Sequence, residues 1–350
     1  MNLAMIGLGM VAATHLNAIK ASTKGLTLRG VCSRDASKAA AFIKEHMPDA
    51  VERVRVYTSV DEIAGDAAID FVIVATPPNA RADIIGKLVA AGKHILLEKP
   101  IERDWKAASA IVEQCEAAGV TLGIVFQHRA REVSQKLRAL LGSGETGPIR
   151  VAEIAVPWWR AQSYYDEPGR GTYARDGGGV LISQAIHTMD LALSFTGAVK
   201  KVQAMARTSA LHRMEAEDFV TAGLDFESGA IGSLTASTAS YPGSAESITL
   251  HCEHVSVCLK SGKLDLHWQD GRTETIGEDM ASGGGADPMA FTHEWHQAVI
   301  EDFADAIRSG RPPIAPGREA LAVHRLIDAL ALSSRTERAV TLSELDKTHD

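Results

Sequence analysis

Two closely spaced glycines near the start of the chain have the pattern of a phosphate-binding turn. The stretch Gly7-Leu-Gly9-Met-Val-Ala12 follows an apolar strand pattern, Asn2–Ile6, and precedes a helical pattern, Thr14–Ala21. The glycines permit a tight turn and let backbone N–H groups approach a pyrophosphate, whose negative charge the start of the helix favours. This order of elements predicts a dinucleotide site rather than a structural glycine-rich turn. Its expected lining residues are Gly7, Gly9, Met10 and Val11.

The end of the second expected strand bears on the choice between NAD and NADP. An NAD enzyme usually places Asp or Glu there to accept a hydrogen bond from the ribose 2′-hydroxyl. Ser33 and Arg34 occupy that place here, and a guanidinium suits a 2′-phosphate. Asp35 follows and is expected to cap the helix that begins at Ala36. The pattern favours NADP(H) as the cofactor, with NAD(H) as the alternative.

The elements that must position these residues alternate between strand-like and helix-like patterns through the first third of the chain. This alternation predicts an α/β Rossmann domain, a doubly wound parallel sheet, over residues 1–125. The expected strands are Asn2–Ile6, Leu26–Cys32, Phe71–Ala75, His94–Leu97 and Val120–Phe126. The expected helices are Thr14–Ala21, Ala36–His46, one that begins at Ser59, Asn79–Ala91 and Trp105–Ala118.

Beyond about residue 150 the strand patterns follow one another with few helices between them. Residues 126–350 are therefore expected to form an α+β domain with a large, mostly antiparallel open sheet for substrate binding and oligomerisation. The expected strands are Val151–Val156, Lys200–Arg207, Phe219–Phe226, Ala230–Thr235, Ser247–Cys252 and Val255–Lys260. The expected helices are Gly179–Phe195, Pro288–Ser309 and Arg318–Ser333.

Aromatic side chains concentrate in one short segment of this second domain. The chain has five Trp and five Tyr, and five of these ten residues fall between positions 158 and 173. Aromatic faces and fixed hydroxyls such as those of Tyr164 and Tyr165 suit a sugar ring. Arg160 and Arg170 in the same segment can hold an anionic group. The alternative is an interface or lid filled with aromatic side chains.

Composition excludes several classes of protein. The formal net charge is −8 and basic residues are scattered, so no nucleic-acid surface is expected. No apolar run reaches the roughly 20 residues that span a bilayer, so a cytoplasmic protein without a membrane partner is expected. Cys252 and Cys258 lie near two histidines, but their segment alternates like a strand and lacks the usual zinc spacing. No metal is expected.

Further motifs resemble the glucose–fructose oxidoreductase/inositol dehydrogenase/MocA family over essentially the whole chain. They are the Ala75–Asn79 ATPPN turn, Glu98-Lys99-Pro100, Gly177-Gly-Gly179 leading to His187-x-x-Asp190, and Asp302-Phe-x-x-Ala306-Ile-x-x-Gly310-Arg-Pro-Pro313. By motif position the resemblance implies Lys99 beside the nicotinamide and His187 as the acid/base. It also implies NADP for a chain with a Ser-Arg pair after the second strand. The implied further cofactor-binding residues are Ala75, Thr76, Pro77, Asn79, Glu98, Lys99 and Gln127.

The chain departs from this family at two positions. Ser183 stands where many members have Asp, and Arg81 stands where many have His. Because of the first departure, the chain lacks the Asp of the Lys-Asp-His set that is usual in the family. Within the family the aromatic segment is similar to the UDP-sugar 3-dehydrogenases and related sugar dehydrogenases. That similarity implies substrate contacts from Arg160, Tyr164, Tyr165, Arg170, Ser183 and Gln184.

Hydride transfer from an alcohol carbon needs a base for the hydroxyl proton and a group that stabilises the developing oxyanion. Lys99 can hydrogen-bond the substrate oxygen, and His187 can take the proton. On a continuous α-helix Ser183, His187 and Asp190 share one face, so Asp190 can orient the histidine. Asp190 is also a candidate substrate-binding residue.

The sequence therefore predicts an NAD(P)-dependent oxidoreductase acting on a carbinol or keto carbon of a sugar, cyclitol or nucleotide-linked sugar. The alternative is a non-catalytic dinucleotide sensor or regulator with the same fold. Because the open sheet needs its exposed face covered, a homo-oligomer, dimer or tetramer, is expected.

Overall fold

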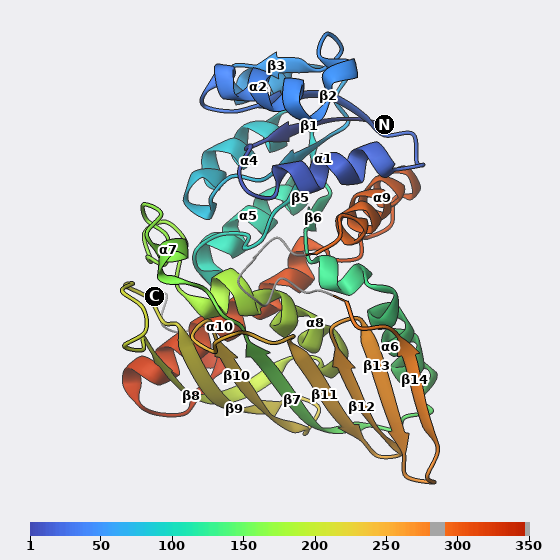
Figure 1. Cartoon of the computed structure of the whole chain (residues 1–350), viewed down its shortest axis with the longest axis vertical. Helices are drawn as coiled ribbons and strands as arrows, with labels where there is room; N and C mark the ends of the chain where they lie inside the picture. Colours follow the sequence, from blue (N-terminus) through green and yellow to red (C-terminus); the bar gives the residue numbers. More distant parts are fainter. Residues whose placement is uncertain (281–290, 347–350) are drawn as a thin grey trace. The chain divides into compact units, whose positions relative to one another are not determined.

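A six-stranded parallel sheet organises the first of two units in this computed structural model, which describes residues 1–280 and 291–346 (Figure 1). Unit 1 contains Met1–Glu102, Lys106–Ala130 and Thr292–Ala320, and unit 2 contains Arg103–Trp105, Arg131–Phe291 and Leu321–Asp350 as far as they are described. No helix among the described residues is long and apolar enough to cross a membrane.

The strand order of unit 1 is β3-β2-β1-β4-β5-β6 with parallel pairing throughout. This is the order of a dinucleotide-binding Rossmann sheet, as predicted. The strands are β1 (Asn2–Ile6), β2 (Thr27–Cys32), β3 (Arg55–Tyr57), β4 (Phe71–Val74), β5 (His94–Leu97) and β6 (Leu122–Ile124). The longer helices are α1 (Ala12–Ala21), α2 (Ala36–His46), α3 (Val60–Gly65), α4 (Arg81–Ala90), α5 (Trp105–Ala117) and α9 (Glu294–Ser309), and the short ones are η1 (Pro48–Ala50), η2 (Pro78–Ala80) and η3 (Gln127–Ala130).

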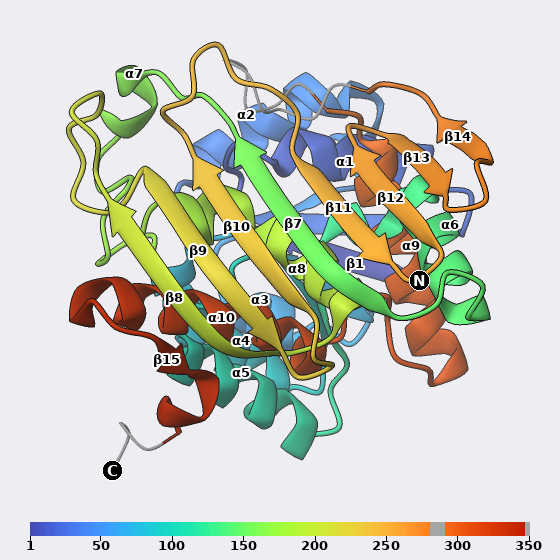
Figure 2. The ribbon, with the colours of Figure 1, turned by 90° about the horizontal axis from the view of Figure 1, so that it is seen from below.

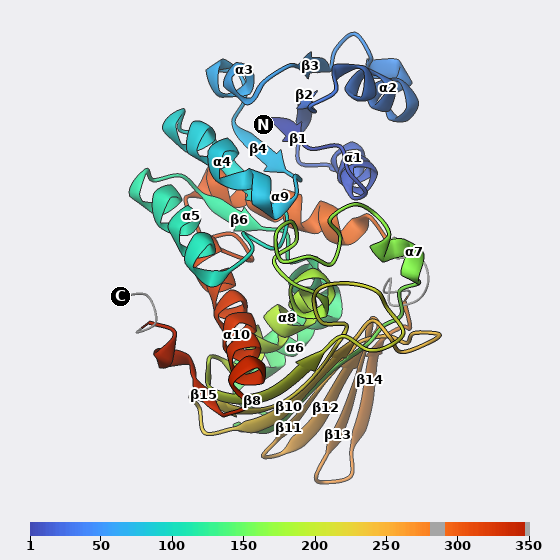
Figure 3. The same ribbon diagram turned by 90° about the vertical axis from the view of Figure 1, so that its left-hand side faces the viewer.

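Helices cover both faces of this sheet, which explains why every residue of β4 is apolar and buried. Figure 3 shows α1 and α2 on one side of the strands and α4 and α5 on the other. The core on the α1 side also includes Val299, Ile300 and Phe303 of α9. The Phe303 ring meets the ring of Phe71 at a centroid distance of 5.5 Å. α9 therefore completes unit 1, although the boundary predicted at residues 125/126 assigns it to the second domain.

Unit 2 contains a nine-stranded sheet in the order β14-β13-β12-β11-β7-β10-β9-β8-β15. It is mostly antiparallel as predicted, and the β7–β10 pair is parallel. The strands are β7 (Ile149–Pro157), β8 (Val199–Arg207), β9 (Phe219–Phe226), β10 (Ile231–Ser237), β11 (Ser247–Cys252), β12 (Val255–Lys260), β13 (Lys263–Trp268), β14 (Thr273–Gly277) and β15 (Val340–Thr341). The other elements are α6 (Glu132–Ser143), α7 (Gln162–Tyr165), η4 (Leu181–Ala185), α8 (Ile186–Thr196), α10 (Gly317–Thr336) and η5 (Leu342–Glu344), and α10 begins in unit 1.

The two faces of the unit 2 sheet differ. Buried and less buried residues alternate along β9 and β11, as expected of strands with one packed face. Within unit 2 the packed face lies against α8 and α6. Figure 2 looks onto the opposite face, where no described helix of this unit covers the central strands.

The starts of two predicted helices need correction. The helix expected over Gly179–Phe195 begins at Leu181, and its first turn, η4, is π-helical before α8 starts at Ile186. His187 and Asp190 both lie on α8, three positions apart and therefore on one face, whereas Ser183 lies on the preceding π-helical turn. The helix expected from Pro288 begins at Glu294; positions 288–290 lie outside the described residues. Strands β3, β13, β14 and β15 were not predicted.

Candidate active site

The Gly7 turn lies between β1 and α1, and it requires glycine at its first position. Gly7 has a φ of +95°, and a Cβ there would meet the backbone of Ala75 at 2.7 Å and that of Thr76 at 2.9 Å. The Gly7 N–H donates to the Cys32 carbonyl at 3.0 Å, which fixes the turn against the end of β2. A Cβ at Gly9 would meet nothing within 4 Å, so this stretch of backbone is open to a ligand. The turn fits the cradle of a pyrophosphate at the start of α1.

The other cofactor candidates in unit 1 follow the carboxyl ends of neighbouring strands. Ala75, Thr76, Pro77 and Asn79 follow β4, Glu98 and Lys99 follow β5, and Gln127 begins η3 after β6. The strand order reverses between β1 and β4, which is where doubly wound sheets bind ligands.

Two buried polar atoms in this group have no hydrogen-bond partner among the described residues. They are Thr76 Oγ1 and Gln127 Oε1. Buried polar atoms are normally paired, so the Thr76 hydroxyl can donate to or accept from a bound group, and the Gln127 amide oxygen can accept from one. Together with the Gly7 turn, they make the residues of unit 1 a fit for a dinucleotide.

Ser33 and Arg34 follow β2, and the Arg34 side chain is exposed. Asp35 caps α2 as predicted, accepting from the N–H groups of Ser37 at 3.0 Å and Lys38 at 3.2 Å. The Ser37 hydroxyl and the Lys38 N–H hold the pKa of the Asp35 carboxyl below its ordinary value. Asp35 thus serves the helix, and Ser33 and Arg34 are the two residues between the end of β2 and this cap.

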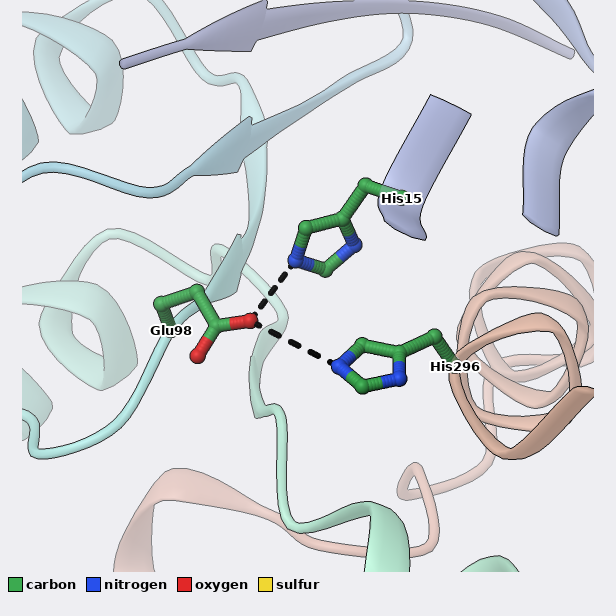
Figure 4. Close-up of side chains that lie close together, drawn as sticks. All are labelled: His15, Glu98 and His296. Atoms are coloured by element: carbon green, nitrogen blue, oxygen red, sulfur yellow. Dashed lines mark hydrogen bonds and ion pairs between the residues drawn. The ribbon is translucent and has the colours of Figure 1, made fainter. Parts of the chain in front are cut away.

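Glu98 lies between two buried histidines that come from distant parts of the sequence (Figure 4). His15 Nε2 of α1 lies 2.7 Å from Glu98 Oε1, and His296 Nε2 of α9 lies 4.0 Å from the same oxygen. All three side chains are buried. Burial raises the pKa of Glu98, but the His15 hydrogen bond and the charges of His15, His296 and Lys99 outweigh it and bring this pKa to about 2. Burial, with His15, lowers the pKa of His296 to about 3.

Glu98 is therefore a carboxylate and His296 a neutral imidazole at neutral pH, and the His15 ring donates to the carboxylate. The three donor atoms lie within 4.8 Å of one another, a donor set that a divalent metal accepts. Sequence reasoning selected Glu98 but not His15 and His296, because 281 positions separate the two histidines and no local pattern connects them.

In unit 2 the structure brings together three of the predicted substrate contacts. The Tyr164 hydroxyl accepts from Arg170 Nη1 at 2.9 Å and from Gln184 Nε2 at 3.2 Å. The Arg170 guanidinium also lies 4.4 Å from the centre of the Tyr164 ring and pairs with Glu167. Because the hydroxyl oxygen is the acceptor in both of these hydrogen bonds, the Tyr164 O–H can donate to a substrate oxygen.

Arg160 and Tyr165 lie inside the packing of the same segment. Arg160 is 3% exposed, and its Nη1 donates to the Trp159 carbonyl at 2.7 Å. The Tyr165 hydroxyl lies 2.6 Å from Thr238 Oγ1, and burial raises the pKa of this phenol. His212, which sequence reasoning missed, lies 2.7 Å from Asp218 and 2.8 Å from the Arg160 carbonyl. Trp158, Arg160 and Tyr165 are thus buried, whereas Tyr173 of the same segment is 52% exposed.

Ser183, His187 and Asp190 lie on η4 and α8; His187 and Asp190 are buried, and Ser183 is half-buried. The start of η4 is held by Glu217, another residue that sequence reasoning missed. Its carboxylate accepts from the N–H groups of Gly179 at 3.2 Å and Leu181 at 3.1 Å. A Cβ at Gly179 would lie 1.8 Å from the Glu217 carbonyl oxygen, so glycine is required there.

The Rossmann sheet of unit 1 with its phosphate turn, followed by a large open sheet, defines a two-domain NAD-binding oxidoreductase. Residues 1–126 match the family model described as "Oxidoreductase family, NAD-binding Rossmann fold", and residues 134–258 match the "GFO/IDH/MocA C-terminal domain". The chain belongs to the GFO/IDH/MocA family, as its motifs predict.

Several relatives match along most of their length. The chain is 25% identical to D-xylose 1-dehydrogenase (NADP(+)) 2 of Haloferax volcanii over 89% of this chain and 91% of that protein. It is 26% identical to scyllo-inositol 2-dehydrogenase (NAD(+)) of Bacillus subtilis over 89% and 87%. A 27% identical oxidoreductase of Schizosaccharomyces pombe matches over only 52% of this chain and 49% of its own length.

Solved structures share the fold of the whole chain. The WlbA dehydrogenase of Chromobacterium violaceum, solved with NADH and UDP-GlcNAcA, superposes with a TM-score of 0.82 at 27% identity, covering 97% of this chain and 95% of that one.

Proposed function

We propose that this protein is an NAD(P)-dependent dehydrogenase that transfers hydride between the nicotinamide and a carbinol or keto carbon of a sugar, cyclitol or nucleotide-linked sugar. The observation that carries the proposal is the combination, within unit 1, of an open Gly7 turn with Lys99 at the carboxyl end of β5. Relatives named as D-xylose and scyllo-inositol dehydrogenases support the substrate class.

The reaction removes a hydride from the alcohol carbon and a proton from its hydroxyl. When bound, the nicotinamide supplies the hydride acceptor. The Lys99 ammonium hydrogen-bonds the substrate oxygen and stabilises the charge that develops on it, and His187 takes the proton. Asp190 orients the histidine ring. In the reverse direction His187 returns the proton to the alkoxide.

Tyr164, Arg170 and Gln184 form the polar group that we assign to the substrate. A phenol that can donate, beside a guanidinium and an amide, suits the hydroxyls or an anionic substituent of a sugar. Arg160, Tyr165 and Ser183 complete the proposed set.

We favour NADP(H) over NAD(H) because Ser33 and the exposed Arg34 follow β2 where an NAD enzyme usually has an acidic residue. One of these relatives is named as NADP(+)-dependent and the other as NAD(+)-dependent, so membership of the family does not decide between the two cofactors.

A turnover screen tests the function. Purified protein is mixed with NADP⁺ or NAD⁺ and a panel of free sugars, cyclitols and nucleotide-linked sugars, and reduced cofactor is followed by absorbance. We expect turnover with at least one panel member. Tight cofactor binding without turnover on any of them would instead support the non-catalytic sensor.

A further inference from the structure

Arg81, the first residue of α4, is an arginine held by backbone carbonyl groups. Its side chain is 2% exposed. Nε and Nη2 donate to the Thr76 carbonyl at 3.0 and 2.7 Å. Nη1 donates to the carbonyls of Glu98 and Pro100 and lies 3.5 Å from that of Ile101. One guanidinium therefore connects the loop after β4 with the loop after β5.

These contacts depend on the charge and shape of the arginine side chain. Burial lowers the pKa of Arg81 to about 10, and the charges of Glu98 and Glu102 oppose that shift, so the group stays charged at neutral pH. A guanidinium is planar and presents its donors in a fixed fork, whereas a lysine ammonium is a single point on a flexible stem. Only the fork reaches both loops at once.

The carbonyls that Arg81 holds lie on both sides of Lys99 in the sequence. Glu98 precedes Lys99 and Pro100 follows it, so the backbone that carries the Lys99 side chain is fixed at both neighbours. The Thr76 carbonyl ties the same guanidinium to the turn that contacts Gly7.

We propose that Arg81 is a positioning residue: its buried guanidinium holds the Glu98–Ile101 loop in register with the Gly7–Thr76 turn and so sets where the Lys99 ammonium lies. The inference rests on the proposed function for the role of Lys99. It extends that function by adding a residue that acts through the loop carrying Lys99 and is assigned no contact with substrate or cofactor.

The test compares Arg81→Ala, Arg81→Gln and Arg81→Lys with the wild-type protein. A small misplacement of a catalytic group costs about 100-fold in rate, so we expect kcat of Arg81→Ala to fall by roughly that factor. The Kd for the cofactor should change far less. The Lys and Gln side chains can donate to only some of the carbonyls that Arg81 binds. The kcat values of Arg81→Lys and Arg81→Gln should therefore lie between those of wild type and Arg81→Ala.

Chemical rescue separates positioning from general damage. Methylguanidinium at millimolar concentration should restore part of kcat to Arg81→Ala, whereas sodium chloride at the same ionic strength should not. Methylguanidinium should not restore kcat to Lys99→Ala, because that variant lacks the ammonium group that Arg81 positions. Ile85→Ala removes a buried side chain one turn further along α4 and serves as the matched packing control, with a lower Tm but near-normal kcat.

Amide hydrogen exchange gives a readout that needs no turnover. In Arg81→Ala the peptide covering residues 97–102 should take up deuterium faster, and methylguanidinium should reverse this. Unchanged exchange, or a wild-type kcat in folded Arg81→Ala, would overturn the proposal. Equal kcat losses in Arg81→Ala and Ile85→Ala without rescue would also overturn it. A wild-type protein without turnover would refute the proposed function alone, since the exchange result still decides whether Arg81 holds the loop.

Discussion

Glu98 is held in two separate ways, through its side chain and through its backbone. His15 binds its carboxylate from α1, and Arg81 binds its carbonyl from α4. These helices pack on opposite faces of the sheet (Figure 3). The residue before Lys99 is therefore fixed from both sides, which is a stronger constraint than the Glu-Lys-Pro motif expresses in sequence.

The two proposed catalytic side chains should affect rate rather than cofactor affinity. We expect Lys99→Ala and His187→Ala each to lower kcat by at least ~100-fold, because each removes a group that handles charge in the transition state. Cofactor Kd, measured by fluorescence titration, should stay within a few-fold of wild type. Lys87→Ala, which removes an exposed lysine paired with Asp61, is the control. Near-normal turnover in either variant removes that residue from the mechanism.

Arg34 should set the cofactor preference. Replacing it with Ala removes the charge available to a 2′-phosphate, so Kd for NADP(H) should rise by about 10-fold or more while Kd for NAD(H) changes little. Calorimetric titration of both cofactors into both proteins measures the effect. A wild-type preference for NAD(H) would contradict the assignment.

His296 should make the fold sensitive to mild acid. Its folded-state pKa of about 3 lies below the ordinary value of 6.5, so the unfolded chain binds a proton that the folded chain excludes. The stability from the neutral ring is complete above pH 6.5 and is lost as pH falls from there towards 3. Glu98, with its pKa lowered from 4.5 to about 2, adds a second loss below pH 4.5.

We therefore expect Tm to fall between pH 7 and pH 5, and to fall less in His296→Gln than in wild type. His267→Gln, a change at an exposed histidine of β13, should retain the wild-type slope. Parallel Tm profiles for wild type and His296→Gln would show that the ring is not held neutral.

At the scale of elements, the η4–α8 segment depends on an acceptor from outside its own sequence. The Glu217 carboxylate accepts from two N–H groups at its start, and the Glu217 carbonyl accepts from the Val180 N–H at 2.8 Å. Burial raises the pKa of Glu217, and the backbone hydrogen bonds oppose that rise.

Glu217→Ala should lower stability by about 1–2 kcal/mol, the usual cost of losing a helix cap, or roughly 3–6 °C in Tm. It should also lower kcat, since His187 lies in the first turn of α8. Glu215→Ala, at an exposed carboxylate two positions earlier, is the matched control for thermal melts and kinetics. Equal Tm values for Glu217→Ala and Glu215→Ala would contradict the capping role of Glu217.

Strong local patterns allowed the elements to be predicted, and long-range contacts limited the prediction. The bounds of β9, β11 and β12 agree with the predicted strands because strict alternation is a property of the strand itself. The π-helical turn at Leu181 could not be foreseen, because it depends on Glu217 and on the close approach of Gly179. Likewise the Arg81 contacts join residues 17 to 20 positions apart, which no periodicity reveals.

For the molecule as a whole, the open face of the unit 2 sheet predicts self-association. Met205 on β8 and Ile231 on β10 are 48% and 57% exposed. Met205 lies opposite Thr221 of β9, which lies opposite Thr235 of β10. Ile231 is four residues before Thr235 on β10, and side chains an even number of residues apart lie on the same face of a strand. Met205 and Ile231 therefore lie on the same face of the sheet. Figure 2 shows that face without a covering helix of this unit.

Light scattering at micromolar concentration should therefore give a dimer or tetramer. The double variant Met205→Lys/Ile231→Lys should shift the mass towards the monomer, whereas Lys200→Glu, at an exposed residue near the edge of the sheet, should not. A wild-type monomer would argue against association through this face.

The late position of α9 in the chain also affects how the protein is made. The Phe303 ring packs on Phe71 and fills the space above Gly123, yet it is synthesised long after both. At about 5–20 residues per second, roughly 10–30 s pass between the emergence of Ala130 and that of α9. During that interval the nascent sheet exposes the apolar surface that Phe303 later covers. The core of unit 1 is thus completed only after α9 has been synthesised.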